Sequence, residues 1–211
     1  MPEHEMNQVP PYEFYTQKRW ENWLGRAKES GFQIKESEEE AGKESAVFVN
    51  MVDDVILACL KVTARFEKEM LSKEQALEIL GEVRDIVFSE VDPISEDIDL
   101  MIESVRTSLM GAFIAFENYV MGDYDEGANI AELIKAAVDA EASDNLDLAL
   151  DFTAQCGALV LKGQTLPEEA MAELPYGIVA EWLDGIDSIS AAMVGSDSYK
   201  EFDEDDEEDV V

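Results

Sequence analysis

Apolar residues recur every three or four positions along most of this chain, which is the pattern of amphipathic helices. The first such segment is expected to be helical from about Tyr12 to Ser30, and Gly31 is expected to end it. One face of this helix carries the apolar residues Trp20, Trp23, Leu24 and Ala27. The segment is also the most basic in the chain, so we expect its tryptophans to dock it against the acidic remainder.

Further amphipathic segments follow a charged connection over residues 29–45. Three helices with long apolar faces are expected at 52–70, at 77–87 after a capping box formed by Ser72 and Gln75, and at 98–120 between Ser95 and Gly122. Later helices are expected at 130–138, from Ser143 or Asp144 to 159, at 167–175, and from about Tyr176 to 189.

The fold class follows from these faces. No convincing alternation of apolar and polar residues indicates a strand, apart from a short extended piece at Gly31 to Lys35. We therefore predict an all-α protein, an irregular single-domain bundle of about seven to eight mostly antiparallel helices. Residues 1–11 are expected to form a flexible arm, residues 12–194 the helical domain, and residues 195–211 a disordered acidic tail.

The charge of the chain restricts its partners. It has 49 acidic and 15 basic residues, a formal net charge of -34, and the acidity is not confined to the tail. Such a chain repels the phosphates of nucleic acid and an anionic membrane surface, so neither is expected as a direct partner. Two interpretations stay open: an acidic surface adapted to a high-salt cytosol, or one that attracts a basic protein.

The expected location is the cytoplasm. Cys59 and Cys156 are far apart and lie in apolar segments, which indicates buried thiols in a reducing compartment. No N-terminal stretch has the pattern of a signal peptide, and no window approaches the roughly 20 apolar residues of a membrane span.

Candidate chemistry is sparse. The single histidine, His4, lies in the N-terminal arm, which excludes catalytic triads and His-anchored metal sites on the body, and no nucleotide-binding motif is found. No cofactor is expected, and the sequence favours a protein without enzymatic activity. Asp123, Asp125 and Glu126 resemble the start of a calcium loop, but Gly127 stands one place early and Ile134 occupies the place of the bidentate glutamate.

Two adjacent carboxylates, Asp53 and Asp54, interrupt the second apolar helix. The interpretation we favour places both on the solvated face, because neighbouring positions on a helix rarely both face a core. A functional site is the alternative, with a partner among the basic residues of the helices, which are Lys61, Arg65, Arg84 and Arg106.

Two sets of residues are candidates for contact with a partner. Trp20, Trp23 and Trp182 stand at helical spacing, which is typical of a core, although tryptophan is also enriched in binding hot spots. The tail is either a solvated extension or a contact for a basic protein. Its candidate residues are Phe202, Asp203, Glu204, Asp205, Asp206, Glu207, Glu208 and Asp209.

Three segments resemble an uncharacterised archaeal family, domain of unknown function 2150, found in methanogens and haloarchaea. They are Phe14 to Leu24 (FYTQKRWENWL), Val83 to Val91 (VRDIVFSEV) and Tyr176 to Ser188 (YGIVAEWLDGIDS). The resemblance covers about residues 12–192 and implies an acidic cytosolic protein from an archaeon. It assigns no catalytic or binding residue.

Taken together, these observations favour a non-enzymatic protein that acts through protein contacts, as an adaptor or regulator, with a salt-adapted acidic surface. A carboxylate-based divalent cation binder or metal-dependent enzyme is one alternative. A nucleic-acid mimic that inhibits a basic protein is another. The sequence leaves the oligomeric state open.

Overall fold

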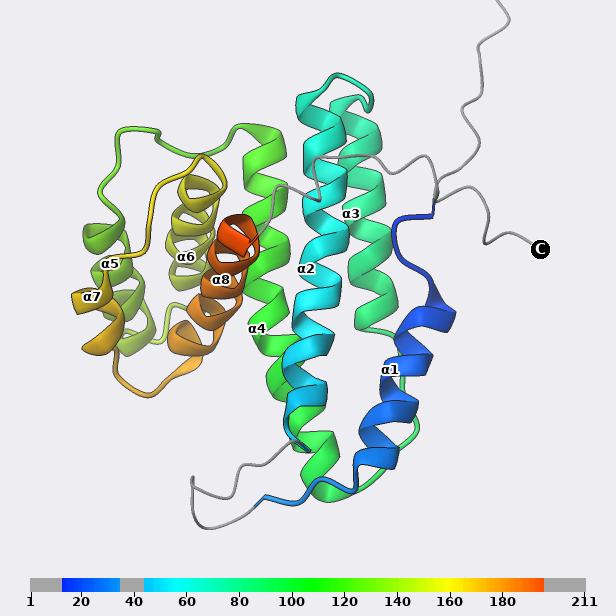
Figure 1. Cartoon of the computed structure of the whole chain (residues 1–211). Coiled ribbons are helices and arrows are strands. Elements are labelled where there is room, and N and C mark those ends of the chain that lie inside the picture. Colours follow the sequence, from blue (N-terminus) through cyan, green and yellow to red (C-terminus); the bar gives the residue numbers. More distant parts are fainter. Residues whose placement is uncertain (1–12, 35–43, 196–211) are drawn as a thin grey trace, which may run out of the picture.

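The computed structural model describes residues 13–34 and 44–195, and within these residues it contains eight helices and no strand (Figure 1). The all-α prediction is therefore confirmed, and the short extended piece expected from Gly31 forms no strand in its described part. In chain order the helices are α1 (Gln17–Ser30), α2 (Ala46–Glu67), α3 (Lys73–Val87), α4 (Glu96–Met121), α5 (Ile130–Ala142), α6 (Leu146–Leu161), α7 (Glu168–Ala172) and α8 (Ile178–Gly195).

Helix α4 is the centre of the bundle. With 26 residues it is the longest helix, about 39 Å, and it packs against α2, α3, α6 and α8. Helix α5 packs on the far side of α6, whereas α1 packs against α2 and α3 at the opposite end of the bundle (Figure 1). The bundle thus has an α1–α3 side and an α5–α7 side, which α4 separates.

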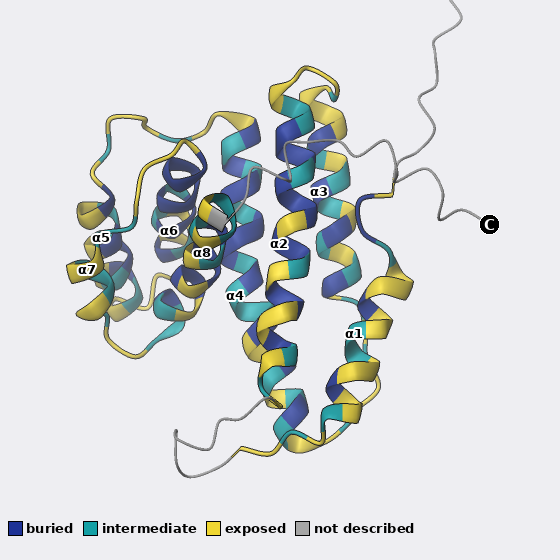
Figure 2. Cartoon of the chain, in the orientation of Figure 1, coloured by how far each residue is buried: buried dark blue, intermediate teal, exposed yellow. Residues whose placement is uncertain are grey.

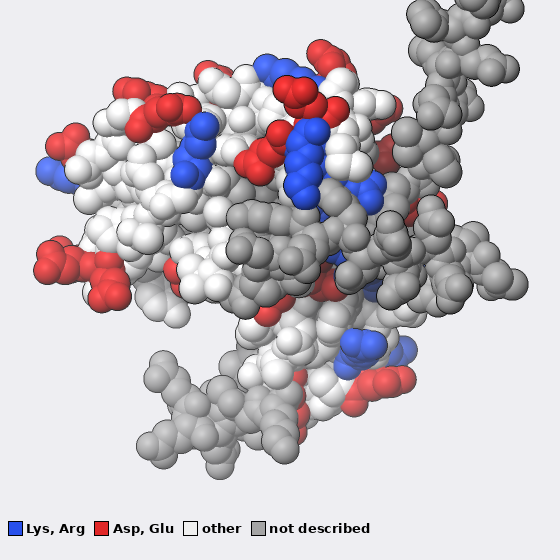
Figure 3. Space-filling model, turned by 45° about the horizontal axis from the view of Figure 1, so that its top comes forward, with Lys and Arg blue, Asp and Glu red and all other residues white. Residues whose placement is uncertain are grey.

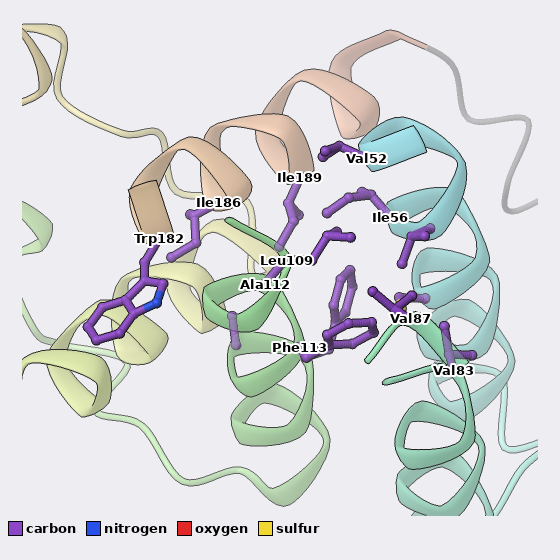
Figure 4. Packing of buried hydrophobic residues seen from close by; sticks show 14 of the residues in the cluster. Val52, Ile56, Val83, Val87, Leu109, Ala112, Phe113, Trp182, Ile186 and Ile189 are labelled. Carbon is purple, nitrogen blue, oxygen red and sulfur yellow. The ribbon is translucent and has the colours of Figure 1, made fainter. Parts of the chain in front are cut away.

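The core lies where the apolar faces of the long helices meet. One buried cluster includes residues of four helices, which Figure 4 labels: Val52 and Ile56 of α2, Val83 and Val87 of α3, Leu109, Ala112 and Phe113 of α4, and Trp182, Ile186 and Ile189 of α8. In this view the Trp182 ring lies at one end of the cluster and points away from the residues of α2 and α3. Colouring by burial gives each long helix a buried face toward its neighbours and an exposed face toward solvent (Figure 2). The predicted amphipathic pattern is therefore what assembles the bundle.

Glycines allow α4, α6 and α8 to approach closely. A Cβ atom added at Gly185 of α8 would collide with the backbone carbonyl oxygen of Ser108 on α4. At Gly111 an added Cβ would lie 2.8 Å from the Cβ of Trp182, and at Gly157 it would collide with Ala115. Each crossing therefore depends on the absence of a side chain.

Several helix ends follow the sequence signals. Ser72 and Gln75 form the expected capping box of α3, and the Ser95 side chain accepts a hydrogen bond from the Ile98 N–H. Gly31 and Gly122 have φ of 63° and 73°, the left-handed conformation that ends a helix at little cost for glycine.

Three predicted helix starts are wrong. Helix α2 begins at Ala46 and not at residue 52, because Val47 and Phe48 extend its apolar face toward the N-terminus. Helix α1 begins at Gln17, because the Thr16 hydroxyl accepts from the Arg19 N–H and caps it there, so the segment before it is not helical. Helix α6 begins after Asn145, whose side chain caps it, because Asp144 has a positive φ of 58° that interrupts the helical path.

Helix α8 has a cap that comes from another element. The Glu141 carboxylate of α5 accepts from the Ile178 N–H at 2.7 Å and from the Val179 N–H at 3.4 Å. A carboxylate at this position satisfies unpaired donors and complements the helix dipole. At the other end α8 includes Gly195, which the sequence placed in the tail. The remaining tail and the N-terminal arm lie outside the described residues.

The surface shows the acidity of the chain. Acidic side chains are spread over the face shown in Figure 3, with fewer Lys and Arg among them. In the described part of the chain, no helix is long and apolar enough to cross a membrane.

Candidate functional site

The α1–α3 side has a groove of about 830 Å³ between two stretches that are distant in sequence. One wall is formed by the non-helical residues 13–16 together with Gln17, the first residue of α1, and the other is a face of α3 between Gln75 and Ile86. The end of α2 and the turn that follows it complete the lining. We call this feature the α3 groove.

The floor of the α3 groove is apolar. Helix α3 contributes Ile79 and Ile86, which are partly buried, and Val83, which is buried. Phe14 lies on the opposite wall, and Met70 in the turn after α2 is 55 % exposed. A flexible, exposed methionine next to partly buried isoleucines is typical of surfaces that take up an apolar partner group.

The edge of the α3 groove is acidic. Glu78, Glu82 and Asp85 stand beside the apolar residues of α3 and are all exposed. Within the described residues, none of these three carboxylates has a hydrogen bond or ion pair. Glu13 adds a fourth acid, and Arg65 is the one basic residue in the lining. The groove is therefore strongly negative at its edge and apolar at its base.

The wall formed by residues 13–17 is held by aromatic contacts. The Arg65 guanidinium lies over the Phe14 ring, 5.0 Å from its centroid, and Arg19 lies over the Tyr15 ring at 5.3 Å. Tyr15 is 6 % exposed, and burial together with the nearby Asp54 carboxylate raises the pKa of its phenol. Tyr15 therefore stays neutral and acts as a packing residue for this wall.

Asp54 fixes α1 on α2. Its carboxylate accepts from the Arg19 Nε at 2.8 Å and Nη2 at 2.5 Å, and from the Trp23 Nε1 at 2.7 Å. The interpretation that places Asp54 on the solvated face is therefore wrong, although it is right for Asp53, which is exposed. The partner is Arg19 of α1, which was not among the partners expected from the sequence. This contact positions α1 and with it the adjoining wall of the groove.

The predicted calcium loop forms the connection between α4 and α5. Asp123, Asp125 and Glu126 are exposed there. The Asp125 side chain accepts from the Gly127 N–H at 2.9 Å, and Glu126 pairs with Lys162 at 3.2 Å. Among residues 13–34 and 44–195, no group of three or more Asp, Glu, Cys or His side chains is placed to hold a metal ion. The cation-binding alternative stays a prediction.

The cysteines offer no nucleophile. Both are free and buried, and burial raises the pKa of the Cys156 thiol to about 12 and that of Cys59 further. A thiol in such surroundings stays protonated at neutral pH.

The tryptophans divide into two groups. Trp20 and Trp182 are core residues, 0 % and 5 % exposed, so neither reaches the surface. Trp23 is partly buried, donates to Asp54 and carries Arg26 over its ring at 4.6 Å. The candidate residues of the tail, from Phe202 to Asp209, lie outside the described residues.

The α3 groove was not predicted from the sequence, although the pattern of its α3 wall is visible there. The predicted apolar face of α3 runs through Leu80, Val83 and Val87 toward the core, whereas Ile79 and Ile86 lie beside it, next to Glu78, Glu82 and Asp85. A second apolar row flanked by acids at helical spacing indicates a second contact surface. The opposite wall depends on the path of residues 13–17, which the sequence assigned to a helix.

Comparison with known proteins identifies the family of the chain. No curated protein and no solved structure matches the chain. A family model described as "uncharacterized protein conserved in archaea (DUF2150)" matches residues 13–202, which include all eight helices and the three segments on which the resemblance was based. The chain therefore belongs to this archaeal family.

Proposed function

We propose that this protein acts without catalysis, by binding another protein, and that the α3 groove is the docking surface for a basic partner. The observation that carries the proposal is the combination of an apolar floor, with Met70 55 % exposed, and an edge of acids without partners among the described residues. The floor supplies contact area, and the acids select positive charge and speed association. The two buried free thiols support action in the reducing cytoplasm.

Two further features support a binding role. The α3 groove is shaped by rigid elements, because the capping box fixes the start of α3 and the Asp54 contacts fix α1. A preformed groove loses little conformational entropy when a partner binds. The acids at its edge are also exposed, so an incoming Lys or Arg can reach them without displacing a residue of the core.

Site-specific photo-crosslinking tests this proposal. Full-length bait carries the crosslinker benzoylphenylalanine in place of Gln75, an exposed residue of the groove, or in place of Asp147, an exposed residue on the α5–α7 side. The replacement at Gln75 removes the side-chain half of the capping box but keeps the hydrogen bond from its backbone N–H to the Ser72 hydroxyl, so the cap of α3 is retained. After irradiation in lysate of an archaeal host at high potassium, we expect one protein, identified by mass spectrometry, at Gln75 and not at Asp147. Bait that also carries Met70→Glu should lose this product.

Two outcomes would contradict the proposal. Crosslinking that is equal at Gln75 and Asp147 would show that proteins contact the acidic surface indiscriminately. No product at Gln75 above the unirradiated sample would show that the groove has no partner in that lysate. In either case the groove is not the docking surface.

A further inference from the structure

We infer that the segment entering the α3 groove is an amphipathic helix, with apolar residues on one face and Lys or Arg along the flank that faces α3. This inference rests on the proposed function and specifies its partner.

The apolar row of the groove has helical spacing. Ile79 and Ile86 are partly buried and stand two turns apart on α3, and Val83, which is 1 % exposed, lies between them at the base of the groove, at steps of four and three. At 1.5 Å per residue these steps are about 6 and 4.5 Å, the spacing at which side chains recur on one face of a helix. A second helix packed along α3 can place its own residues i, i+4 and i+7 between them. Side chains on one face of an extended strand recur at about 6.6 Å and would lose this register.

The acidic row runs parallel to the apolar row with the same steps. Glu78, Glu82 and Asp85 span about 10 Å of α3. Basic residues at i, i+4 and i+7 on the flank of a partner helix would meet all three carboxylates at once. The other wall carries one acid, Glu13, so positive charge is favoured on one flank more than on the other.

The chain's own acidic tail is a poor occupant. It carries eight acids between Glu201 and Asp209 and no base after Lys200. Four acids and one base in the groove lining would repel it. The N-terminal arm contains Pro2, Pro10 and Pro11, and proline at those places does not suit a helix interior. A basic helix from another protein is the occupant that fits both rows.

Synthetic peptides test the inference directly. The probe is a labelled amphipathic peptide of about 16 residues with Leu on one face and Lys on one flank, which we call the Lys peptide. A scrambled peptide has the same composition without amphipathicity, and a third peptide has Glu in place of each Lys. Binding to the full-length chain is measured by fluorescence anisotropy at about 0.15 M and about 1 M KCl. We expect the Lys peptide to bind at least about tenfold more tightly than the other two at about 0.15 M KCl. At about 1 M KCl its advantage over the Glu peptide should shrink, because exposed charges are screened, whereas its advantage over the scrambled peptide should remain.

Matched variants locate the binding. The first variant reverses the three acids of α3 and should lower the affinity for the Lys peptide by about tenfold or more. Its substitutions are Glu78→Lys, Glu82→Lys and Asp85→Lys. The control variant makes the same change in net charge on the α5–α7 side, with the substitutions Asp147→Lys, Asp151→Lys and Glu169→Lys. Its affinity for the Lys peptide should stay within about twofold of that of the parent chain. Because these six side chains are exposed, both variants should fold, which circular dichroism checks.

The floor is tested separately from the charges. Met70→Ser removes an exposed apolar side chain and should lower the affinity for the Lys peptide about fivefold. The thermal unfolding temperature should not change. Unchanged affinity in this variant would show that attraction by charge alone explains binding, and it would overturn the inference.

Several other results would also overturn it. An equal loss of affinity for the Lys peptide in the two charge-reversal variants would indicate diffuse attraction between charges. Binding of the scrambled peptide as tight as that of the Lys peptide would exclude recognition of a helix. A full-length variant whose eight tail acids are Asn or Gln should bind the Lys peptide as the parent does. An affinity about tenfold higher in that variant would show that the tail occupies the groove.

The failures of the two proposals can be told apart. If Gln75 crosslinks a protein but mass spectrometry places the crosslink in a segment that is not a basic helix, the helix inference fails and the proposed function stands. If Gln75 crosslinks nothing, the proposed function fails, whatever the peptides do.

Discussion

Replacing Trp20 with alanine is expected to lower the free energy of unfolding by about 3–5 kcal/mol. Trp20 is 0 % exposed and is the largest fully buried side chain of α1, which otherwise buries only Ala27 completely. Its loss leaves a cavity under a helix that packs against α2 and α3 only at one side of the bundle. Chemical denaturation measures the effect, and hydrogen exchange should show faster exchange in α1 than in α4.

The matched control for Trp20 is phenylalanine. The Trp20 indole nitrogen is buried and has no hydrogen-bond partner among the described residues, so Trp20→Phe eliminates an unsatisfied donor and its desolvation cost. Trp20→Phe should therefore cost less than about 1.5 kcal/mol, because most of the ring volume is kept. Trp20→Ala should also lower the affinity for the Lys peptide, because α1 holds the wall formed by residues 13–17, whereas Trp20→Phe should leave this affinity unchanged. Equal stability of the two variants would contradict this role of Trp20.

Gly185→Val is expected to destabilise the protein by about 3 kcal/mol. The first added carbon would collide with the carbonyl oxygen of Ser108, which belongs to the backbone of α4 and cannot rotate away. Helices α4 and α8 would have to separate, and Trp182, Ile186 and Ile189 would lose packing with α4 (Figure 4). Thermal and chemical denaturation of the purified variant measure the loss.

Gly81→Val is the control for Gly185→Val. Gly81 lies within α3, and an added Cβ would meet nothing within 4 Å. Valine is a slightly better helix former than glycine, so we expect a change within about 0.5 kcal/mol. If both variants lost the same stability, the cost would come from valine in a helix and not from the α4–α8 crossing.

The fold could be predicted because its main determinants are local. The capping box at Ser72 and Gln75, the Ser95 cap and the terminal glycines Gly31 and Gly122 act within a few residues of the helix ends they set. The error at α1 has a local cause as well. Phe14 and Tyr15 continue the apolar pattern backward from the helix, but the Thr16 cap places them in the non-helical wall of the groove.

The candidate site could not be predicted in the same way, because it joins distant residues. Asp54 contacts Arg19, 35 positions away, and periodicity within one helix does not show that α1 will lie over it. The α3 groove likewise needs the segment 13–17 beside α3, a pairing that no spacing in the sequence encodes. The acids Glu78, Glu82 and Asp85 were three among 49, and only their place at the groove edge distinguishes them.

The central claim is that the α3 groove is the binding surface, and methyl NMR of the full-length chain tests it most directly. Isoleucine δ1 methyl groups are followed while the unlabelled Lys peptide is added. The account predicts shifts at Ile79 and Ile86, which line the groove, and none at Ile134 of α5 or Ile189 in the core. Shifts that leave Ile79 and Ile86 unchanged while other isoleucines move would place binding elsewhere and contradict the account.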